Sequence, residues 1–498
     1  MKTRLILLAA LLVHPLAAEE ANPFVKKKDE AKKSEPPPGP AFVGILEHVL
    51  VPPDLIDAWI KQHGMPADAT ALRAEVQKWV EEKKASLDCT MMASGVMGRI
   101  STNERIIERI YPTEYLEAGA GVWPYPTAFE TRNLGYTAEF FSNASDGNIR
   151  FSVDVDFCEL QGSKAWNVVA EKTRQPDDVF MPIIRNYRLK QNGPAINGKP
   201  VDADPFADPQ DAFSKAEPLS ASDYRPSFES DRVHLLARFD PLSVERKQGF
   251  PSRLIFARGA AAPEVEKTAR LAEDFAYTVA TIRVPHVEFS SWLQSQQPIT
   301  AQLSAWSFAE SLCMEGKAEV IESAGSRAKV SKSNTLENIS EIIYPTEYSP
   351  SCQRTVTERW EERERQNVDG KPVEGVATKA TVKTDALSGL AGASMATSFE
   401  TRNTGMTYEL QILPDESGVL AKHILERVIH VGESVHRRIE DQGKWIPDIT
   451  MPIFSTCRFN TTNRLQSGKW TLIATGPEYA ENGKADREQC LLMFVKVE

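Results

Sequence analysis

Three histidines near the carboxyl-terminal end carry the side chains best suited to chemistry near neutral pH. They are His423, His430 and His436, spaced by seven and six residues. Zinc sites of the His-Glu-x-x-His kind need two histidines four residues apart on one helix face. The spacing here does not fit that pattern. We therefore interpret the three as ordinary strand and loop residues and predict no bound metal.

Other catalytic patterns are not found in the sequence. It has no Gly-x-Ser-x-Gly turn, no phosphate-binding glycine loop and no Gly-x-Gly-x-x-Gly segment. Asp154 and Asp156 lie in the alternating segment 151–157, which predicts a strand with its aromatic and aliphatic residues covered and its polar residues in water. Carboxylates on a solvated face do not support paired-carboxylate catalysis. We predict that the protein is not an enzyme and has no cofactor.

The chain repeats itself. Ile-Tyr-Pro-Thr-Glu-Tyr at 110–115 returns at 343–348, a shift of 233 residues, and Phe-Glu-Thr-Arg-Asn at 129–133 returns at 399–403, a shift of 270. The same two shifts pair further residues, among them Glu108 with Glu341 and Met181-Pro182-Ile183 with Met451-Pro452-Ile453. The order of the segments is kept while the second copy gains 37 residues, which indicates a tandem duplication.

The repeat sets the expected domain boundaries. We predict two homologous domains, the first at 42–260 and the second at 275–498. A proline-rich, charged linker at 19–41 precedes them. The first domain contains a long loop at 191–231, and an insertion at 350–398 accounts for the extra length of the second.

Each copy has the same expected order of elements. Apolar, β-branched runs predict strands at 42–51 and 277–284. Helical spacing of apolar residues predicts helices within 67–84 and 300–315, and the insertion is predicted to be partly helical around 358–366. Further short apolar runs bounded by turn residues predict more strands. The expected fold class is α+β, mainly antiparallel β.

The two copies resemble the secretin homology domain of type II and type III secretion systems. The resemblance is carried by the segments 129–137, 181–182, 452–462 and 468–474. It implies a secretin-like core, and members of that family assemble as rings that form a gated outer-membrane channel. The family's paired glycines are reduced here to Gly476 in the second copy, and its small amino-terminal ring domains are absent. We therefore expect a derived member without a channel.

The repeated segments contain the candidate interaction residues. Two tyrosines and an acid could form a recognition surface, but a proline biases its neighbour to extended geometry, so we favour a strand end. Glu130 and Arg132 are expected on one strand face, and Gly135 and Gly405 at a bulge or close backbone contact. The complete set is Tyr111, Pro112, Glu114, Tyr115, Glu130, Arg132, Asn133, Gly135, Tyr344, Pro345, Glu347, Tyr348, Glu400, Arg402, Asn403 and Gly405.

Composition limits the setting in which the protein works. The first eighteen residues carry Lys2 and Arg4, an apolar run and small residues at Ala17 and Ala18, which predicts a secretory signal peptide at 1–18. A formal charge of −11 makes nucleic acid an unexpected partner. No later apolar run has the roughly 20 residues that a membrane-spanning helix needs, so any membrane contact would use strands or a surface. Six cysteines are too sparse for a disulfide scaffold, and their spacing selects no pairing.

These observations favour an exported, non-catalytic structural or assembly protein. We expect it in the periplasm or at the outer membrane, related to protein secretion or pilus machinery, with self-association or other envelope proteins as its partners. The alternative is a periplasmic ligand-binding protein or hydrolase that uses the loops 191–231 and 350–398 as its site.

Overall fold

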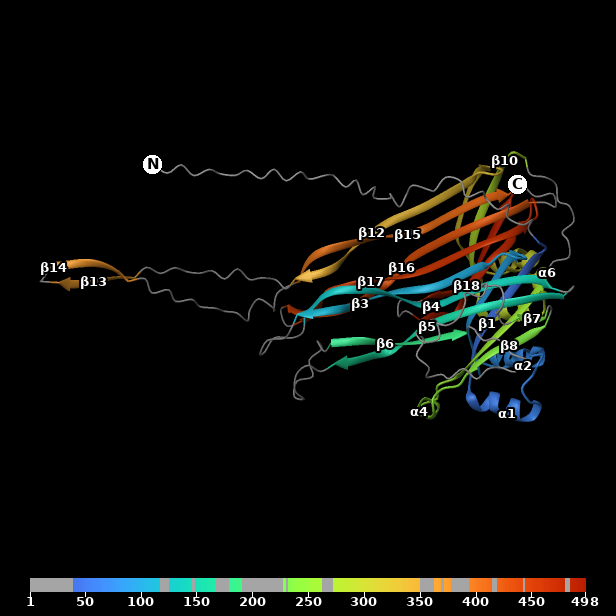
Figure 1. Ribbon diagram of the computed structural model, residues 1–498, viewed down its shortest axis with the longest axis horizontal. Helices are drawn as coiled ribbons and strands as arrows, with labels where there is room; N and C mark the ends of the chain where they lie inside the picture. The colour runs from blue at the N-terminus through green and yellow to red at the C-terminus, as the bar shows by residue number, and fades with distance from the viewer. Residues whose placement is uncertain are drawn as a thin grey trace, which may run out of the picture. The chain divides into compact units, whose positions relative to one another are not determined.

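Long antiparallel strands make up most of the protein and form two main sheets (Figure 1). The computed structural model describes residues 39–116, 125–145, 148–166, 179–189, 227–229, 232–261, 272–349, 362–368, 371–377, 394–413, 419–441, 444–479 and 484–498. The predicted signal peptide and nearly all of the predicted linker and loop lie outside them, whereas 362–368, 371–377 and 394–398 of the predicted insertion lie within them. The mainly antiparallel β class is confirmed.

The first sheet has the strand order β11-β10-β19-β18-β2-β1-β9-β8. Its strands are β1 (Ala41–Val51), β2 (Ser86–Val96), β8 (Val233–Phe239), β9 (Ser252–Ala261), β10 (Asp274–Pro285), β11 (Glu319–Lys329), β18 (Thr471–Tyr479) and β19 (Ala485–Val497). Four neighbouring strands come from residues 39–261, the first half, and four from residues 272–498, the second half. The sheet therefore runs through both halves without a break.

The second sheet has the order β12-β15-β16-β17-β3-β4-β5-β6, with the short β7 beside β5. Its strands are β3 (Ser101–Leu116), β4 (Tyr125–Ser145), β5 (Asn148–Trp166), β6 (Val179–Leu189), β7 (Ser227–Glu229), β12 (Ser333–Ser349), β15 (Met395–Leu413), β16 (Val419–Asp441) and β17 (Lys444–Leu465). A separate hairpin consists of β13 (Glu362–Val368) and β14 (Lys371–Ala377).

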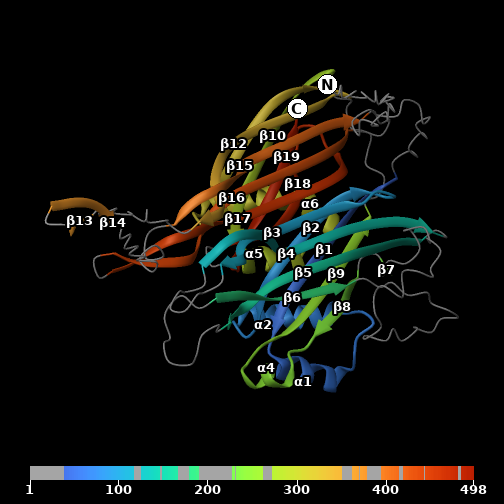
Figure 2. The same ribbon diagram turned by 60° about the vertical axis from the view of Figure 1, so that its left-hand side comes forward.

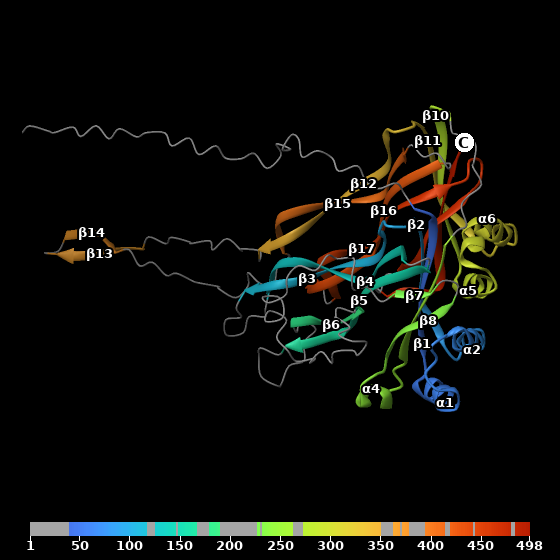
Figure 3. The ribbon, with the colours of Figure 1, turned by 45° about the vertical axis from the view of Figure 1, so that its right-hand side comes forward.

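Helices cover the face of the first sheet that the second sheet leaves free (Figure 3). They are α1 (Pro53–His63), α2 (Thr70–Glu81), α5 (His286–Gln294) and α6 (Pro298–Met314). The short α4 (Ser243–Lys247) buries none of its residues and contacts Arg185 of β6 through Glu245. Phe289 and Leu293, one turn apart on α5, are fully buried in the cluster between helices and sheet. No helix among the described residues is long and apolar enough to span a membrane.

Apolar residues from the two sheets meet in the core. In the first half Phe42 of β1 packs edge-on against Phe151 of β5, with ring centroids 6.1 Å apart. In the second half Tyr277 of β10 contacts Tyr408 of β15 at 5.9 Å. Burying apolar area contributes roughly 25 cal/mol per Å² to stability, so these inter-sheet clusters hold the two layers together.

Irregularities in the strand pairing recur at matching positions of the two halves. The register shifts fall at His48/Val49 and Thr281/Ile282, at Leu160/Gly162 and His430/Gly432, and at Leu235/Ala237 and Leu472/Ala474. The first two are 233 residues apart and the second two are 270 apart, as the repeated words predict. The strand order within each sheet also repeats from one half to the other.

The contacts do not divide the two halves. Gly39–Glu498 forms one compact unit. The predicted boundary between 42–260 and 275–498 stays a prediction about sequence ancestry, since strands of both segments share each sheet.

Several predicted elements are confirmed and one is wrong. Strand β1 and helices α2 and α6 lie within or beside the predicted segments. The alternating segment 151–157 buries its apolar face as expected, although Ser152 is also buried. The helix predicted at 358–366 is wrong for 362–366, which belongs to β13, because backbone pairing with β14 overrides a composition that suits a helix. Helices α1 and α5 were not predicted.

Candidate functional site

The two halves meet edge to edge in both sheets. In the second sheet β17 pairs with β3 from Ile453 opposite Arg109 to Asn460 opposite Thr102, and in the first β18 meets β2 where Ala474 lies opposite Ala93. Figure 2 shows the strands of the second sheet following one another from β12 through β17 and β3 to β6. We call this boundary, β2 and β3 against β17 and β18, the junction.

An ion pair crosses the junction. Arg402 of β15 donates to Glu108 of β3 through Nη2 at 2.6 Å and Nε at 3.1 Å. The Thr456 hydroxyl on β17 donates to the same carboxylate at 2.7 Å, and Glu426 accepts a longer contact of 3.4 Å from Arg402. The Glu108 side chain is 13 % exposed and that of Arg402 is 25 % exposed. Such a two-pronged, hydrogen-bonded pair fixes the register of the strands it joins.

A second, more exposed ion pair lies beside the first. Arg458 of β17 contacts Glu104 of β3 at 3.3 Å and Glu426 of β16 at 2.9 Å. These residues face each other in the strand register, with Arg458 directly opposite Glu104. Exposed pairs of this kind contribute little to folding, about 0.2–1 kcal/mol, but they discriminate between correct and incorrect strand partners.

Small polar side chains fill the buried part of the junction. Ser101 and Thr461 share a hydrogen bond of 2.8 Å, and Thr461 also donates to the carbonyl oxygen of Ser94. In the first sheet the Thr475 hydroxyl donates to the Thr90 carbonyl at 2.9 Å. These groups are buried and hydrogen-bonded, as polar groups in a protein interior usually are.

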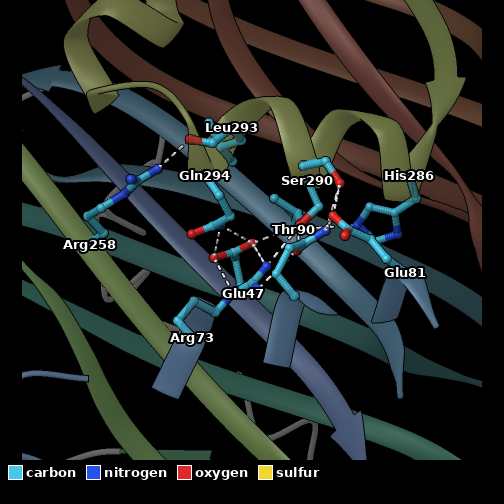
Figure 4. A network of polar contacts seen from close by, with 11 residues as sticks. Glu47, Arg73, Glu81, Thr90, Arg258, His286, Ser290, Leu293 and Gln294 are labelled. Atoms are coloured by element: carbon cyan, nitrogen blue, oxygen red, sulfur yellow. Dashed lines mark hydrogen bonds and ion pairs between the residues drawn. The ribbon is translucent and has the colours of Figure 1, made fainter. Parts of the chain in front are cut away.

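The helix layer adds a buried polar network between the halves (Figure 4). Arg73 of α2 donates to both carboxylate oxygens of Glu47 on β1, at 2.6 and 3.0 Å, and to the Ser290 hydroxyl of α5 at 2.9 Å. Gln294 of α5 donates to the same carboxylate at 3.1 and 3.0 Å. Burial alone would raise the pKa of Glu47, but the adjacent Arg73 guanidinium outweighs it and holds the pKa below its usual value. The network therefore carries an ionised, fully hydrogen-bonded carboxylate.

A cavity of about 340 Å³ lies near the junction, around Asp88 of β2. Arg487 of β19 donates to Asp88 at 2.8 Å, and Tyr136 also donates to it. Burial would raise the pKa of Asp88, but the Arg487 guanidinium and the hydrogen bond donated by Tyr136 hold it below its ordinary value. Burial lowers the pKa of His48 to about 4 and raises that of Tyr136 well above its usual value. At neutral pH the carboxylate is ionised, the imidazole neutral and the phenol protonated.

This arrangement offers recognition more readily than catalysis. Two cysteines lie in the same part of the core, Cys89 and Cys490, and burial raises the pKa of both thiols, so neither is an activated nucleophile. The five described cysteines are free. The polar groups around the cavity are paired charges that could orient a small polar molecule.

Some of the predicted residues of the second half contact the first half. Besides Arg402, Tyr348 packs edge-on against Phe129 of the first half at 5.9 Å. Tyr344 lies in the same buried cluster and donates to Glu400 at 3.3 Å. Pro345 and Glu347 flank a register shift of β12, while Glu400 and Asn403 are exposed on β15.

The predicted residues of the first half lie on β3 and β4, and Asn133 is directly opposite Glu108 in the strand register. Glu130, Arg132 and Asn133 are exposed on β4. Tyr111 and Arg132 line a second cavity of about 450 Å³ together with His436. Pro112, Glu114 and Tyr115 flank the register shifts of β3, at the positions that match those of β12, and burial raises the pKa of Tyr115 to about 12.

The two predicted glycines make the close contacts expected of them. Gly135 has a φ of +114° and Gly405 a φ of +112°. A Cβ on Gly135 would overlap the Tyr479 hydroxyl and the Arg105 carbonyl oxygen, and one on Gly405 would overlap the Asn338 carbonyl oxygen. Glycine is required at both positions for conformation and for space.

The three histidines have separate structural partners. His423 is buried between the Tyr408 hydroxyl at 2.6 Å and the Asn463 side-chain oxygen at 2.8 Å. His436 contacts the Ser434 hydroxyl at 2.9 Å, and His430 lies near a phenylalanine ring. Within the described ranges, histidine, cysteine and acidic side chains form no group of three that could hold a metal ion.

Sequence reasoning missed several of the residues that join the halves. Glu108 keeps the 233-residue register with Glu341, and that match was the available signal, but nothing in the sequence indicates that Arg402 is its partner. Glu47, Arg73 and Asp88 carry no motif.

No family model matches this sequence, and no curated protein matches it either.

Proposed function

We propose that this chain is an exported, non-catalytic structural protein that works by assembly through its sheet edges. The single observation that carries the proposal is the junction, where two β-rich halves continue each other's sheets through paired strands, ion pairs and buried hydrogen bonds. A protein whose own halves associate in this way has surfaces suited to building larger structures.

The proposal includes a tandem duplication of one module. Repeated words at two constant shifts, matching register shifts and a repeated strand order all support it. Each module would contribute four neighbouring strands to each sheet. We also propose this finer description of the fold, the relation to secretins and the role in secretion or pilus machinery.

The polar chemistry near the junction agrees with a structural role. Asp88 is held between Arg487 and Tyr136, and Glu47 between Arg73 and Gln294, so these carboxylates are engaged in hydrogen bonds within the fold. Such groups specify one arrangement of the packed layers.

A second candidate function is the binding of a small polar molecule in the cavity beside Asp88. The cavity is lined by Asp88, Glu159, Arg253 and Arg487, and its volume of about 340 Å³ suits a small ligand. Most of the predicted loop site at 191–231 and 350–398 lies outside the described residues.

Sedimentation velocity of the chain without residues 1–18 tests the assembly function. Over a range of protein concentrations at low ionic strength we expect species whose masses are multiples of the single chain, and we expect the native protein in the envelope fraction of the cell. A single-chain mass at every concentration would contradict the proposal. Binding of a small polar metabolite by that single chain would support the second candidate instead.

A further inference from the structure

The junction occupies two edges inside the chain, and the counterparts of those edges lie at the two ends of the sheets. A shift of 233 residues carries β2 and β3 onto β11 and β12, which end the two sheets on one side, with β12 also paired to β4 where Glu347 lies opposite Ala128. A shift of 270 carries β17 onto β6, and the matching register shifts carry β18 onto β8, which end them on the other. Each of the two strand edges that meet at the junction therefore has a counterpart at an outer end of the sheets.

Both ion pairs of the junction have counterparts of unchanged residue type. The pair Arg402 and Glu108 corresponds to Arg132 and Glu341, and the pair Arg458 and Glu104 corresponds to Arg188 and Glu337. Arg188 lies on β6 and Arg132 on β4, two strands in from that end, whereas both acidic members lie on β12, and all four are exposed. Each end thus carries the charge that complements the other.

The supporting contact within the β6 end is also kept. In the junction Arg458 contacts Glu426 of the neighbouring strand at 2.9 Å. Its counterpart Arg188 contacts Asp156, the residue that matches Glu426, at 2.7 Å. The arginine at the outer end is therefore already positioned as its counterpart is in the junction.

Apolar side chains buried by the junction are exposed at the outer ends. On the acidic side Ile110 is 2 % exposed, whereas its counterpart Ile343 is 65 % exposed. On the basic side Ile453 is 1 % exposed, whereas its counterpart Ile183 is 46 % exposed.

Two further pairs follow the same rule. Phe129 is 8 % exposed against 57 % for Phe399, and Leu87 is 1 % exposed against 50 % for Val320. Large apolar side chains exposed along an unpaired sheet edge mark an interaction surface. Phe129 is covered by Tyr348 of the second half, whereas Leu87 packs mainly against apolar residues of its own half.

We propose that a second copy of this chain docks head to tail, with its β12 antiparallel to β6 of the first copy. By the register of the junction, Arg188 lies opposite Glu337 and Ile183 opposite Ile342 of the incoming copy, and Arg132 reaches Glu341. The inference rests on the assembly function proposed above and names its partner and register. Because the two ends differ, each added copy leaves a new end, which produces a ring or a filament.

The second sheet contributes most of this contact. In the first sheet Ala474 opposite Ala93 predicts Ala237 opposite Ser326. Thr475, which bonds β2 in the junction, is matched by Arg238, and Arg238 is engaged with Asp57 and Asp240 of its own copy. The charges of the second sheet are therefore the place to test the docking.

Charge reversal at one end, measured by sedimentation velocity, separates this docking from any other association. Arg132→Glu and Glu341→Arg each place like charges at the boundary, and we expect each to weaken self-association at least tenfold. Lys61→Glu on α1 and Glu310→Arg on α6 change the charge equally on exposed helix positions and should leave association unchanged. Circular dichroism and thermal unfolding check that the variants fold.

Mixing the two reversed variants gives the decisive measurement. The glutamate introduced by Arg132→Glu in one variant then meets the arginine introduced by Glu341→Arg in the other. The unchanged Arg132 and Glu341 of the two variants also meet, so alternating assemblies should form at wild-type strength. The double variant with both changes in one chain should likewise self-associate.

The outcomes distinguish the docking from the assembly function on which it rests. Wild-type assemblies unaffected by either reversal, or a mixture no stronger than its components, would overturn the docking while leaving the assembly function standing. A wild-type chain that never associates would contradict both.

Discussion

Arg402 on β15 and Glu108 on β3 are 294 residues apart in the chain, yet their side chains form an ion pair with a nitrogen–oxygen distance of 2.6 Å. The pair links the halves where β17 lies against β3. Its basic and acidic members recur as Arg132 and Glu341 at opposite ends of the second sheet. The contact between Arg402 and Glu108 joins the two halves of the chain, and its counterparts suggest how one copy of the chain contacts another.

Loss of the junction ion pair should destabilise the fold. Arg402→Ala leaves Glu108 largely buried with Thr456 as its remaining partner, and we expect the free energy of unfolding to fall by about 1–3 kcal/mol. Urea unfolding followed by circular dichroism measures the change. Arg188→Ala, at the 67 %-exposed counterpart of Arg458, is the exposed control and should cost less than about 0.5 kcal/mol in the single chain. Equal losses of stability in the two variants would mean that the junction ion pair contributes no more than an exposed ion pair.

The buried network beneath the helices should be more sensitive. Arg73→Met removes the main partner of Glu47 and leaves a buried carboxylate without compensation, at a cost of about 3–5 kcal/mol. Replacing the carboxylate as well, in the double variant Arg73→Met with Glu47→Leu, should restore a large part of the loss. Lys78→Met on the exposed face of α2 serves as the control. Chemical unfolding of the four proteins provides the comparison, and an unchanged stability of Arg73→Met would contradict the role given to the network.

Stability should fall as the solution is made more acidic, partly through buried histidines. Burial lowers the pKa of His423 to about 4, below its ordinary value near 6.5. Between these two pH values the unfolded chain therefore binds a proton at this imidazole and the folded chain does not. This contribution to stability is fully present above pH 6.5 and is lost as the pH falls from 6.5 toward 4.

The variant His423→Gln isolates that contribution. Between pH 7 and pH 5 the wild type should lose about 2 kcal/mol more than the variant, measured as free energies of unfolding in urea. His63→Gln, at an exposed position on α1, should retain the wild-type pH dependence. If the free energies of unfolding of wild type and His423→Gln change with pH in parallel, folding does not lower the pKa of His423 and the prediction is wrong.

Two glycine substitutions separate backbone conformation from lack of space. Gly98 has a φ of +82° and open space where a Cβ would lie, so Gly98→Ala should cost only about 1 kcal/mol of backbone strain. At Gly135 a Cβ would also overlap Tyr479 and the Arg105 carbonyl, so Gly135→Ala should cost clearly more. Thermal unfolding of both variants gives the comparison, and similar losses would show that the strands separate easily at Gly135.

Much of the local structure could be predicted from the sequence. The alternating segment 151–157 and the apolar run at 42–51 indicate strands because their patterns have the period of a pleated backbone. Helix α5 was missed although Phe289 and Leu293 have helical spacing, because nine residues are a weak periodic signal. The prediction of a helix at 362–366 failed because charged residues favour a helix in isolation, whereas a partner strand supplies backbone hydrogen bonds that composition does not record.

The candidate site was predicted in part. Arg402, Tyr344 and Tyr348 were singled out from repeated words, and they lie at the junction. Their counterparts in the first half, Arg132, Tyr111 and Tyr115, have different neighbours, since two identical segments need not lie in identical surroundings. Repetition marks equivalent positions in a fold, but it does not say which surface of one half meets the other.

The sequence by itself determined the repeated order of elements and the class of the fold, because periodicity and local residue preferences act over a few neighbouring residues. Only the tertiary structure decided that β17 lies beside β3, so that Arg402 reaches Glu108 and Ile110 is buried while Ile343 is exposed. Pairing between distant strand edges depends on shape and charge across hundreds of residues, and that information is present only once the chain has folded.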